Sequence, residues 1–260
     1  MIESIIIGIV EGATEFLPVS STGHILITEQ LLKTHRSDAF NVLLQVGPIL
    51  ASALVFHQRI TSWFFKIKEP ATRKELLQIL VAFLITGFGG LAMQKAGIEL
   101  PDTLLPIAWA TLIGAPVIFL VERRANQTPG TDSFTWPMVF AVAGAQLVAA
   151  AFPGTSRSGA CVMAALVVGV SRPVAVEFSF LVGIPTMLAA GGYKLMKEVK
   201  AGALPELLSL DTLVAFVTAT IVALFAVKWL LGYVRTNTFI PFAWYRLALG
   251  IGLITWAWMA

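Results

Sequence analysis

Hydrophobic residues follow one another in long, nearly uninterrupted stretches along most of the chain. A helix needs about 20 apolar residues to cross the hydrocarbon core of a bilayer. Six stretches approach this length, at roughly 40–57, 75–94, 104–121, 174–194, 211–231 and 240–259. The pattern therefore predicts an all-α polytopic membrane protein with six transmembrane helices.

Two further apolar regions, 1–33 and 134–171, are interrupted near their middles by proline, glycine and hydroxyl residues. These interruptions read Pro18-Val19-Ser20-Ser21-Thr22-Gly23 and Pro153-Gly154-Thr155-Ser156-Arg157-Ser158-Gly159. Irregular backbone at membrane depth is tolerated only where it is buried in protein or lines a cavity. We therefore expect each region to form a re-entrant helical hairpin, and the two interruptions to meet inside the protein.

A broken hairpin followed by three spans occurs twice along the chain, at a shift of about 135 residues. An odd number of membrane crossings in one copy turns the next copy upside down, which gives an inverted-topology repeat. We expect a single membrane domain over residues 1–260, with a first repeat over 1–125 and a second over 134–260.

Composition agrees with a lipid environment, since 57% of the residues are hydrophobic and 13% are charged, against about 25% charged in soluble domains. The net charge is only +3, and the basic residues gather in short connectors, which argues against nucleic acid as a partner. Basic connectors favour the cytoplasmic side. Those at 58–74, after 121 and near 235 are therefore expected there, although the connector 195–210 also carries lysines.

Two acids stand inside the first apolar region. Glu11 and Glu15 are one helical turn apart and lie on one helix face. A charge at the bilayer centre costs on the order of 2.5–3.5 kcal/mol, and two adjacent acids also repel each other. Such a pair is stable when one acid is protonated or when a cation or base lies between them. The alternative is a pair near a helix end that reaches the headgroups.

The first interruption places hydroxyl residues and a histidine directly before an apolar helix. Ser20, Ser21 and Thr22 are typical helix N-caps, and a helix N-terminus also binds anions. His24 adds a base beside a candidate nucleophile, which is an arrangement that phosphoryl transfer uses. Capping alone is the alternative interpretation.

The second interruption repeats this design with an arginine. Ser156 and Ser158 can cap the following helix, and Arg157 supplies a planar charged fork suited to phosphate. An unpaired arginine inside the membrane is costly. We therefore expect Arg157 to meet Glu11, Glu15 or a ligand phosphate, the alternative being a purely structural ion pair.

Other polar residues fall within the apolar regions. Glu177 is expected to pair with Arg172 or Arg246. Gln146 occupies the repeat position of Glu11, so it is expected to line the same cavity.

At the two interruptions the chain resembles a known family. The stretch Glu11–His24 resembles the first signature of the undecaprenyl-diphosphate phosphatases, the bacitracin-resistance family called BacA or UppP, and Pro153–Ala160 resembles its second signature. Further similar stretches are Gly169–Arg172, Glu177–Leu181 and Phe239–Ala243. The resemblance covers nearly the whole chain, and both long motifs are specific.

The resemblance implies an enzyme that removes one phosphate from undecaprenyl diphosphate and so recycles the lipid carrier for peptidoglycan synthesis, conferring bacitracin resistance. It implies inverted repeats with re-entrant helices, a bacterial plasma membrane location, and a site open to the outer, periplasmic face. Expected partners are the isoprenyl diphosphate and membrane lipids, while the sequence does not define an oligomeric state. A lipid-phosphate flippase with the same cavity is the competing function.

Carried over by motif, the expected catalytic residues are Glu15, Ser21, His24 and Arg157. The expected phosphate-binding residues are Ser20, Thr22, Thr155, Ser156, Arg157 and Ser158. Glu11 and Glu15 are expected to bind a divalent cation, Mg²⁺ or Ca²⁺, or to act as a base. The nucleophile is left open between Ser21, His24 and water.

Cys161, the only cysteine of the chain, stands where the family favours threonine. A thiol is a weaker hydrogen-bond donor than a hydroxyl. We therefore expect this exchange to remove a hydroxyl from the phosphate side of the site and to reduce activity.

Overall fold

The computed structural model describes residues 1–98, 103–127 and 130–259. Ala260, the last residue of the predicted second repeat, lies outside the described residues. The described ranges are helical, and their one β-structure feature is an isolated bridge between Thr131 and Val170. The helices are α1 (Ile2–Thr14), α2 (Ser21–Leu32), α3 (Asp38–Val55), α4 (His57–Phe65), α5 (Pro70–Lys95), α6 (Leu104–Ala125), α7 (Trp136–Ala151), α8 (Arg157–Val167), α9 (Arg172–Lys200), α10 (Leu204–Leu207), α11 (Leu210–Tyr233) and α12 (Ile240–Met259).

Six of the helices in the described ranges, α3, α5, α6, α9, α11 and α12, are long and apolar enough to cross a membrane. They coincide with the six predicted spans, so the chain is a multi-pass membrane protein. Three of them extend further than hydropathy indicated, and one of these is α6, which continues to Ala125. Helix α5 begins at Pro70, because proline is favoured in the first helical turn, and α9 continues through its charged end to Lys200.

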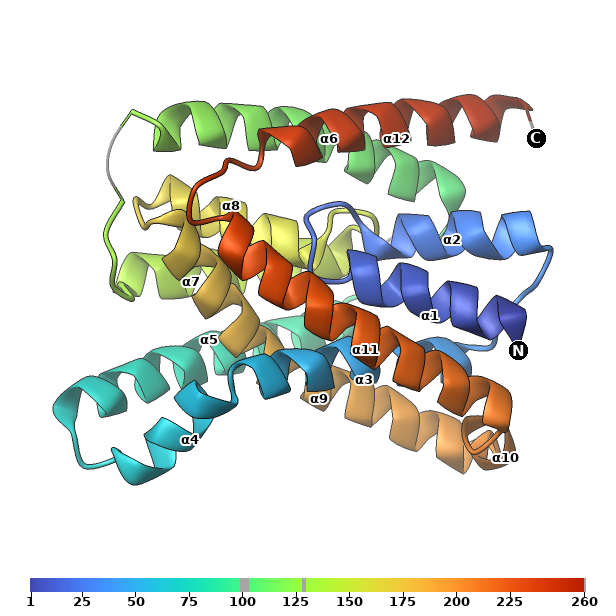
Figure 1. Cartoon of the computed structure of the whole chain (residues 1–260), viewed down its shortest axis with the longest axis horizontal. Helices are drawn as coiled ribbons and strands as arrows, with labels where there is room; N and C mark the ends of the chain where they lie inside the picture. Colours follow the sequence, from blue (N-terminus) through green and yellow to red (C-terminus); the bar gives the residue numbers. More distant parts are fainter. Residues whose placement is uncertain (99–102, 128–129, 260) are drawn as a thin grey trace.

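The two interrupted regions each form a pair of short helices that contact one another, α1 with α2 and α7 with α8. These helices have 13, 12, 16 and 11 residues, and at about 1.5 Å per residue each is shorter than the hydrocarbon core of about 30 Å. In Figure 1 the α1–α2 pair lies to the right and the α7–α8 pair to the left. The turns within the two pairs face each other at the centre of the molecule.

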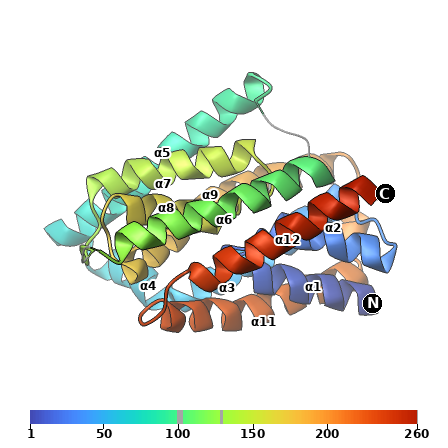
Figure 2. The same cartoon turned by 90° about the horizontal axis from the view of Figure 1, so that it is seen from above.

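The long helices surround these hairpins. Helix α11 packs on α1 and α3, and α5 packs on α7 and α9. Helices α6 and α12 contact each other along their lengths, and Figure 2 shows them side by side across the hairpins. The second hairpin and α9 form much of the apolar core, which includes Phe178, Phe180 and Met138.

Small residues let α1 approach α11 closely. A Cβ atom on Gly8 would lie 2.6 Å from the carbonyl oxygen of Ala215, and one on Gly12 would lie 2.4 Å from that of Ala219. Small residues at such positions are typical of helix contacts inside membranes, where close packing drives association. The first hairpin is therefore held tightly against α11.

The predicted pairing of Glu177 is wrong. Its carboxylate lies 3.9 Å from the guanidinium of Arg59, while Arg172 forms an ion pair with the buried Glu122. Arg246 donates to backbone carbonyls. The sequence offered Arg172 and Arg246 as partners of Glu177, but the fold places Arg59 of α4 next to it instead.

Candidate active site

The two turns are built alike. Ser20 precedes α2 and accepts a hydrogen bond from the N–H of Gly23 (3.3 Å), and Ser156 precedes α8 and accepts one from the N–H of Gly159 (3.2 Å). Both serines have positive φ, 74° and 66°, which is uncommon for residues other than glycine and is often found at functional sites. Each turn therefore directs the N-terminus of a short helix into the interior of the protein.

The turns also contact each other directly. Ser156 and Ser158 both direct Oγ toward the backbone carbonyl of Leu17, at 3.3 and 3.0 Å. A Cβ atom on Gly159 would lie 3.0 Å from the Cβ atom of Pro18. The expected meeting of the two interruptions inside the protein is confirmed.

Glu15 connects the chemistry of the two turns. Its Oε2 accepts a hydrogen bond from the Ser21 hydroxyl at 2.6 Å, and its Oε1 accepts one from Nη2 of Arg157 at 3.1 Å. Glycine at position 183 leaves room for this guanidinium, since a Cβ there would lie 2.7 Å from Nη1 of Arg157. The expected ion pair of Arg157 with an acid is therefore present, and the acid is Glu15.

A cavity of about 250 Å³ opens at this array. Predicted site residues that line it are Glu15, Ser20, Ser21, Thr22, Thr155, Ser156 and Arg157. Glu11, His24 and Ser158 do not line it. Its polar lining therefore combines hydroxyl groups and an arginine around one carboxylate, which suits a phosphate group.

Two polar residues of the lining, Gln45 and Lys194, were not predicted as site residues. A spacing pattern could have found them. On α3 the lining residues are 42, 45, 46 and 49, and on α9 they are 187, 190, 191 and 194. Both sets have the spacing of one helix face. Gln45 and Lys194 are therefore the polar residues on the helix faces of α3 and α9 that line the cavity.

His24 lies beside the first turn but is directed away from Ser21. Its Nδ1 is 2.7 Å from the carbonyl oxygen of Ser20, and its Nε2 is 2.5 Å from the hydroxyl of Tyr245. Because a carbonyl only accepts, Nδ1 carries the proton, and in the neutral ring Nε2 accepts from Tyr245. In this structure, both ring nitrogens are therefore engaged by groups other than Ser21.

A family model described as bacitracin resistance protein BacA matches residues 4–252. The chain belongs to the BacA family. Its relatives include proteins named undecaprenyl-diphosphatase from Xanthomonas euvesicatoria pv. vesicatoria, with 48% identity over 98% of this chain and 97% of the relative, and from Rhizobium etli, with 48% identity over 97% and 96%. One from Xylella fastidiosa has 47% identity over 97% of both chains.

Glu11, one of the two predicted metal ligands of this BacA family member, is buried. Its side chain is 2% exposed, and Oε1 has no hydrogen-bond partner among the described residues. No group of three or more His, Cys, Asp and Glu residues lies together in the described ranges. Two carboxylates still fit Mg²⁺, which commonly takes one or two from the protein and completes its shell with phosphate oxygens and water.

Cys161 is buried between α7 and α8 with Sγ 3.9 Å from the carbonyl oxygen of Val142. It does not line the cavity. The expectation that a cysteine at this position removes a hydroxyl from the phosphate side is therefore wrong. Gln146 was also misplaced, since it bonds Thr86 and Thr186 instead of lining the cavity.

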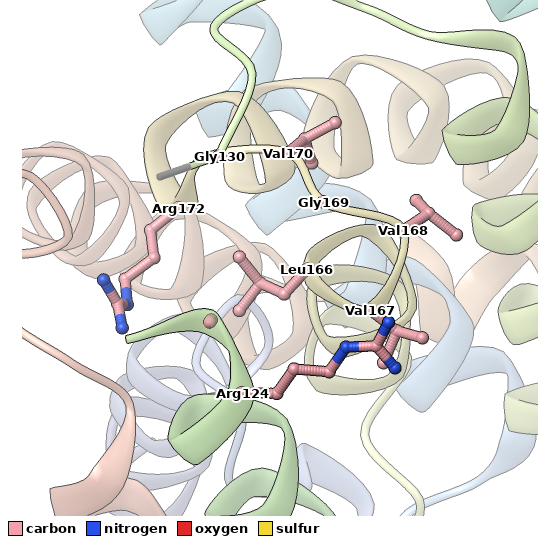
Figure 3. A pocket seen from close by; sticks show the side chains of 9 residues that line it. Arg124, Gly130, Leu166, Val167, Val168, Gly169, Val170 and Arg172 are labelled. Atoms are coloured by element: carbon pink, nitrogen blue, oxygen red, sulfur yellow. The ribbon is translucent and has the colours of Figure 1, made fainter. Parts of the chain in front are cut away.

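A second pocket, of about 310 Å³, lies between the end of α6 and the turn after α8. Figure 3 shows Arg172 and Arg124 on two sides of Leu166 there. The guanidinium of Arg172 is already bound to Glu122 and Asn126. None of the predicted BacA site residues lines this pocket, so the cavity at the two turns is the candidate active site.

Proposed function

We propose that this protein hydrolyses undecaprenyl diphosphate to undecaprenyl phosphate and inorganic phosphate. This recycles the lipid carrier for peptidoglycan synthesis and confers bacitracin resistance. The observation that carries the proposal is the array in which Glu15 joins the Ser21 hydroxyl to the Arg157 guanidinium at the cavity. Relatives that match nearly the whole chain are named for this activity.

The diphosphate lies in the cavity and the isoprenoid tail extends toward lipid. Arg157 binds phosphate oxygens. The N–H groups of Gly23 and Gly159 already donate to the serine caps, so the N–H groups that precede them in the first turns of α2 and α8 are the ones available to the same anion. Four further hydroxyl groups line the cavity, those of Ser20, Thr22, Thr155 and Ser156. Ser20 and Thr22 donate to phosphate oxygens, whereas Thr155 and Ser156 already donate to the carbonyls of Phe152 and Leu17 and reach the phosphate only after their hydroxyl groups rotate. Lys194 adds a second positive charge to the lining.

Ser21 is the proposed nucleophile because its hydroxyl already donates to Glu15 at 2.6 Å. Glu15 accepts the proton as Oγ attacks the terminal phosphorus, and the bond from that phosphorus to the bridging oxygen breaks. Undecaprenyl phosphate leaves, and Arg157 stabilises the charge on the transferring group. Water then attacks the phosphoserine phosphorus and the bond from Oγ of Ser21 to phosphorus breaks. Glu15 returns its proton to Oγ, and inorganic phosphate departs with the oxygen and protons of the water.

Glu11 and Glu15 would hold the proposed divalent cation, Mg²⁺ or Ca²⁺. When bound, that ion neutralises negative charge on the diphosphate. His24 orders the turn through its bond to the Ser20 carbonyl.

The architecture proposed for this function is an inverted-topology repeat of six spans and two re-entrant hairpins. In such a repeat α1 corresponds to α7, α3 to α9, and α5 to α11. The contacts agree with this correspondence, because α1 packs on α11 as α7 packs on α5, and α3 packs on α11 as α9 packs on α5. The identical serine caps before α2 and α8 also support it. With the basic connectors in the cytoplasm, the proposed site opens to the periplasmic face of a bacterial plasma membrane.

The test is phosphate release from undecaprenyl diphosphate by purified protein in detergent. Wild type should release phosphate, whereas Arg157→Ala and Ser21→Ala should lose most of the activity. Wild-type rates in both variants, with folding intact, would exclude the proposal. After an acid quench, wild-type enzyme should carry phosphate on Ser21, and its absence together with an active Ser21→Ala would favour attack by water or His24.

Transport of a lipid phosphate is the second candidate. It is favoured by the meeting of two broken hairpins at one cavity, which is how secondary transporters build their binding sites. Proteoliposomes with a fluorescent lipid phosphate separate the two functions. Translocation without phosphate release would support the transporter and contradict the hydrolase.

A further inference from the structure

Arg246, in the second turn of α12, is 1% exposed, and all of its N–H donors are engaged. A guanidinium has five N–H groups. Nε donates to the carbonyl of Thr111 (3.1 Å), Nη1 to those of Pro18 (3.3 Å) and Thr155 (3.0 Å), and Nη2 to those of Ala110 (2.9 Å) and Gly154 (3.3 Å). One side chain therefore holds five backbone carbonyls.

These carbonyls come from three separate parts of the fold. Pro18 belongs to the first turn, Gly154 and Thr155 belong to the second, and the remaining two carbonyls lie on α6. Ser20 follows Pro18 by two residues, and Arg157 follows Thr155 by two residues. Arg246 thus holds the backbone that leads into both halves of the candidate site.

The five partners are neutral, and Arg246 forms no ion pair with any carboxylate in the described part of the chain. A buried arginine would ordinarily require an anion. Here, carbonyl dipoles stabilise the guanidinium instead. Its positive charge therefore lies behind the two turns whose helix N-termini face the cavity.

The fold leaves a specific space for this guanidinium. A Cβ atom on Gly114 of α6 would lie 2.2 Å from Nη2 and 2.4 Å from Cζ of Arg246. Alanine at this position would displace the guanidinium without changing the arginine itself. By contrast, a Cβ atom on Gly252 of α12 would have no neighbour within 4 Å.

We propose that Arg246 is the positioning residue of the active site: it holds the Ser21 turn and the Arg157 turn in register and supplies a fixed positive charge behind the bound phosphate. Arg246 does not line the cavity, so it acts through the two turns and not by touching substrate. The inference rests on the proposed phosphatase function.

The first experiment compares Gly114→Ala with Gly252→Ala by the kinetics of phosphate release from undecaprenyl diphosphate. Misplacement of catalytic groups by about 1 Å can cost on the order of 100-fold in rate. Gly114→Ala should therefore lower kcat by about that factor, with KM changed by less than about threefold. Gly252→Ala, the same substitution in open space, should stay within about twofold of wild type.

A second pair of variants separates charge from geometry. Arg246→Lys keeps the charge but has three donors instead of five, and Arg246→Met removes both. Both should lose kcat, but inhibition by inorganic phosphate should weaken at least about tenfold only in Arg246→Met. Thermal unfolding in detergent identifies any variant that fails to fold. If Arg246→Met fails to fold, the kcat of Arg246→Lys is the measurement that tests the positioning role.

The outcomes distinguish this inference from the function on which it rests. Absence of phosphate release by wild-type protein would overturn the phosphatase assignment itself. An active wild type together with wild-type kinetics in folded Gly114→Ala and Arg246→Lys would overturn only the role of Arg246. Equal inhibition by inorganic phosphate in Arg246→Lys and Arg246→Met would refute the proposed role of the Arg246 charge in phosphate binding.

Discussion

Replacement of Glu15 by glutamine is the sharpest perturbation of the proposed chemistry. The amide keeps the size of the side chain and can still accept a hydrogen bond from Ser21, but it loses the negative charge that receives the proton. A positioned general base contributes about 10²–10⁴ in rate, which corresponds to about 3–5.5 kcal/mol of barrier. We expect kcat to fall by that factor.

The cost in stability should be much smaller. The Glu15 side chain is 9% exposed and that of Arg157 is 23% exposed, so the pair lies between a surface ion pair, worth up to about 1 kcal/mol, and a fully buried one. We expect Glu15→Gln to lose roughly 1–2 kcal/mol of folding free energy, which leaves a typical domain folded. Loss of activity would therefore not be explained by unfolding.

Glu75→Gln is the matched control. It removes the carboxylate of another ion pair, in which Nη2 of Arg59 lies 2.8 Å from Glu75, away from the cavity lining. The assay is phosphate release with both variants purified in one detergent and checked by thermal unfolding. Glu75→Gln should keep its rate, and a Glu15→Gln rate within about threefold of wild type would refute Glu15 as the base.

Four other changes have expected outcomes. Tyr245→Phe removes only the hydroxyl that donates to the histidine and should slow phosphate release by less than about tenfold; a loss of more than about 100-fold would contradict a supporting role. A chelator should stop the reaction and Mg²⁺ restore it, with Glu11→Gln needing more Mg²⁺; an unchanged Mg²⁺ requirement would contradict Glu11 as a ligand. Cys161→Thr should change kcat by less than about threefold, because the thiol does not line the cavity; a larger gain would show that residue 161 contributes to the active site. Gly12→Ala should destabilise the fold by about 1–3 kcal/mol through overpacking, seen as a lower unfolding temperature that Gly144→Ala, in open space, does not show.

Features determined by local sequence were predicted well. The six spans follow from uninterrupted hydropathy, and the ion pair of Arg157 follows from the cost of an unpaired charge in a membrane. Helix ends were less accurate, because α9 continues into charged residues where hydropathy ends but no helix breaker stands. The serine caps were predicted from the hydroxyl residues that precede each apolar helix.

Contacts between distant segments could not be predicted in the same way. His24 follows Ser21 by three residues, yet its ring turns toward Tyr245, 221 residues away. The carbonyls that bind Arg246 include that of Pro18, 228 residues away. Side-chain direction and partner choice at these positions depend on how α12 packs over the turns, which hydropathy and motif spacing do not encode.

The most direct test of the central claim is a single-turnover reaction of the purified protein with undecaprenyl diphosphate labelled in its terminal phosphate. We expect one labelled inorganic phosphate to be released per lipid, with undecaprenyl phosphate as the lipid product and transient label on Ser21. Release of the label as inorganic diphosphate would contradict this mechanism. Absence of cleavage, while the same protein moves the lipid across the membrane of proteoliposomes, would contradict the phosphatase function.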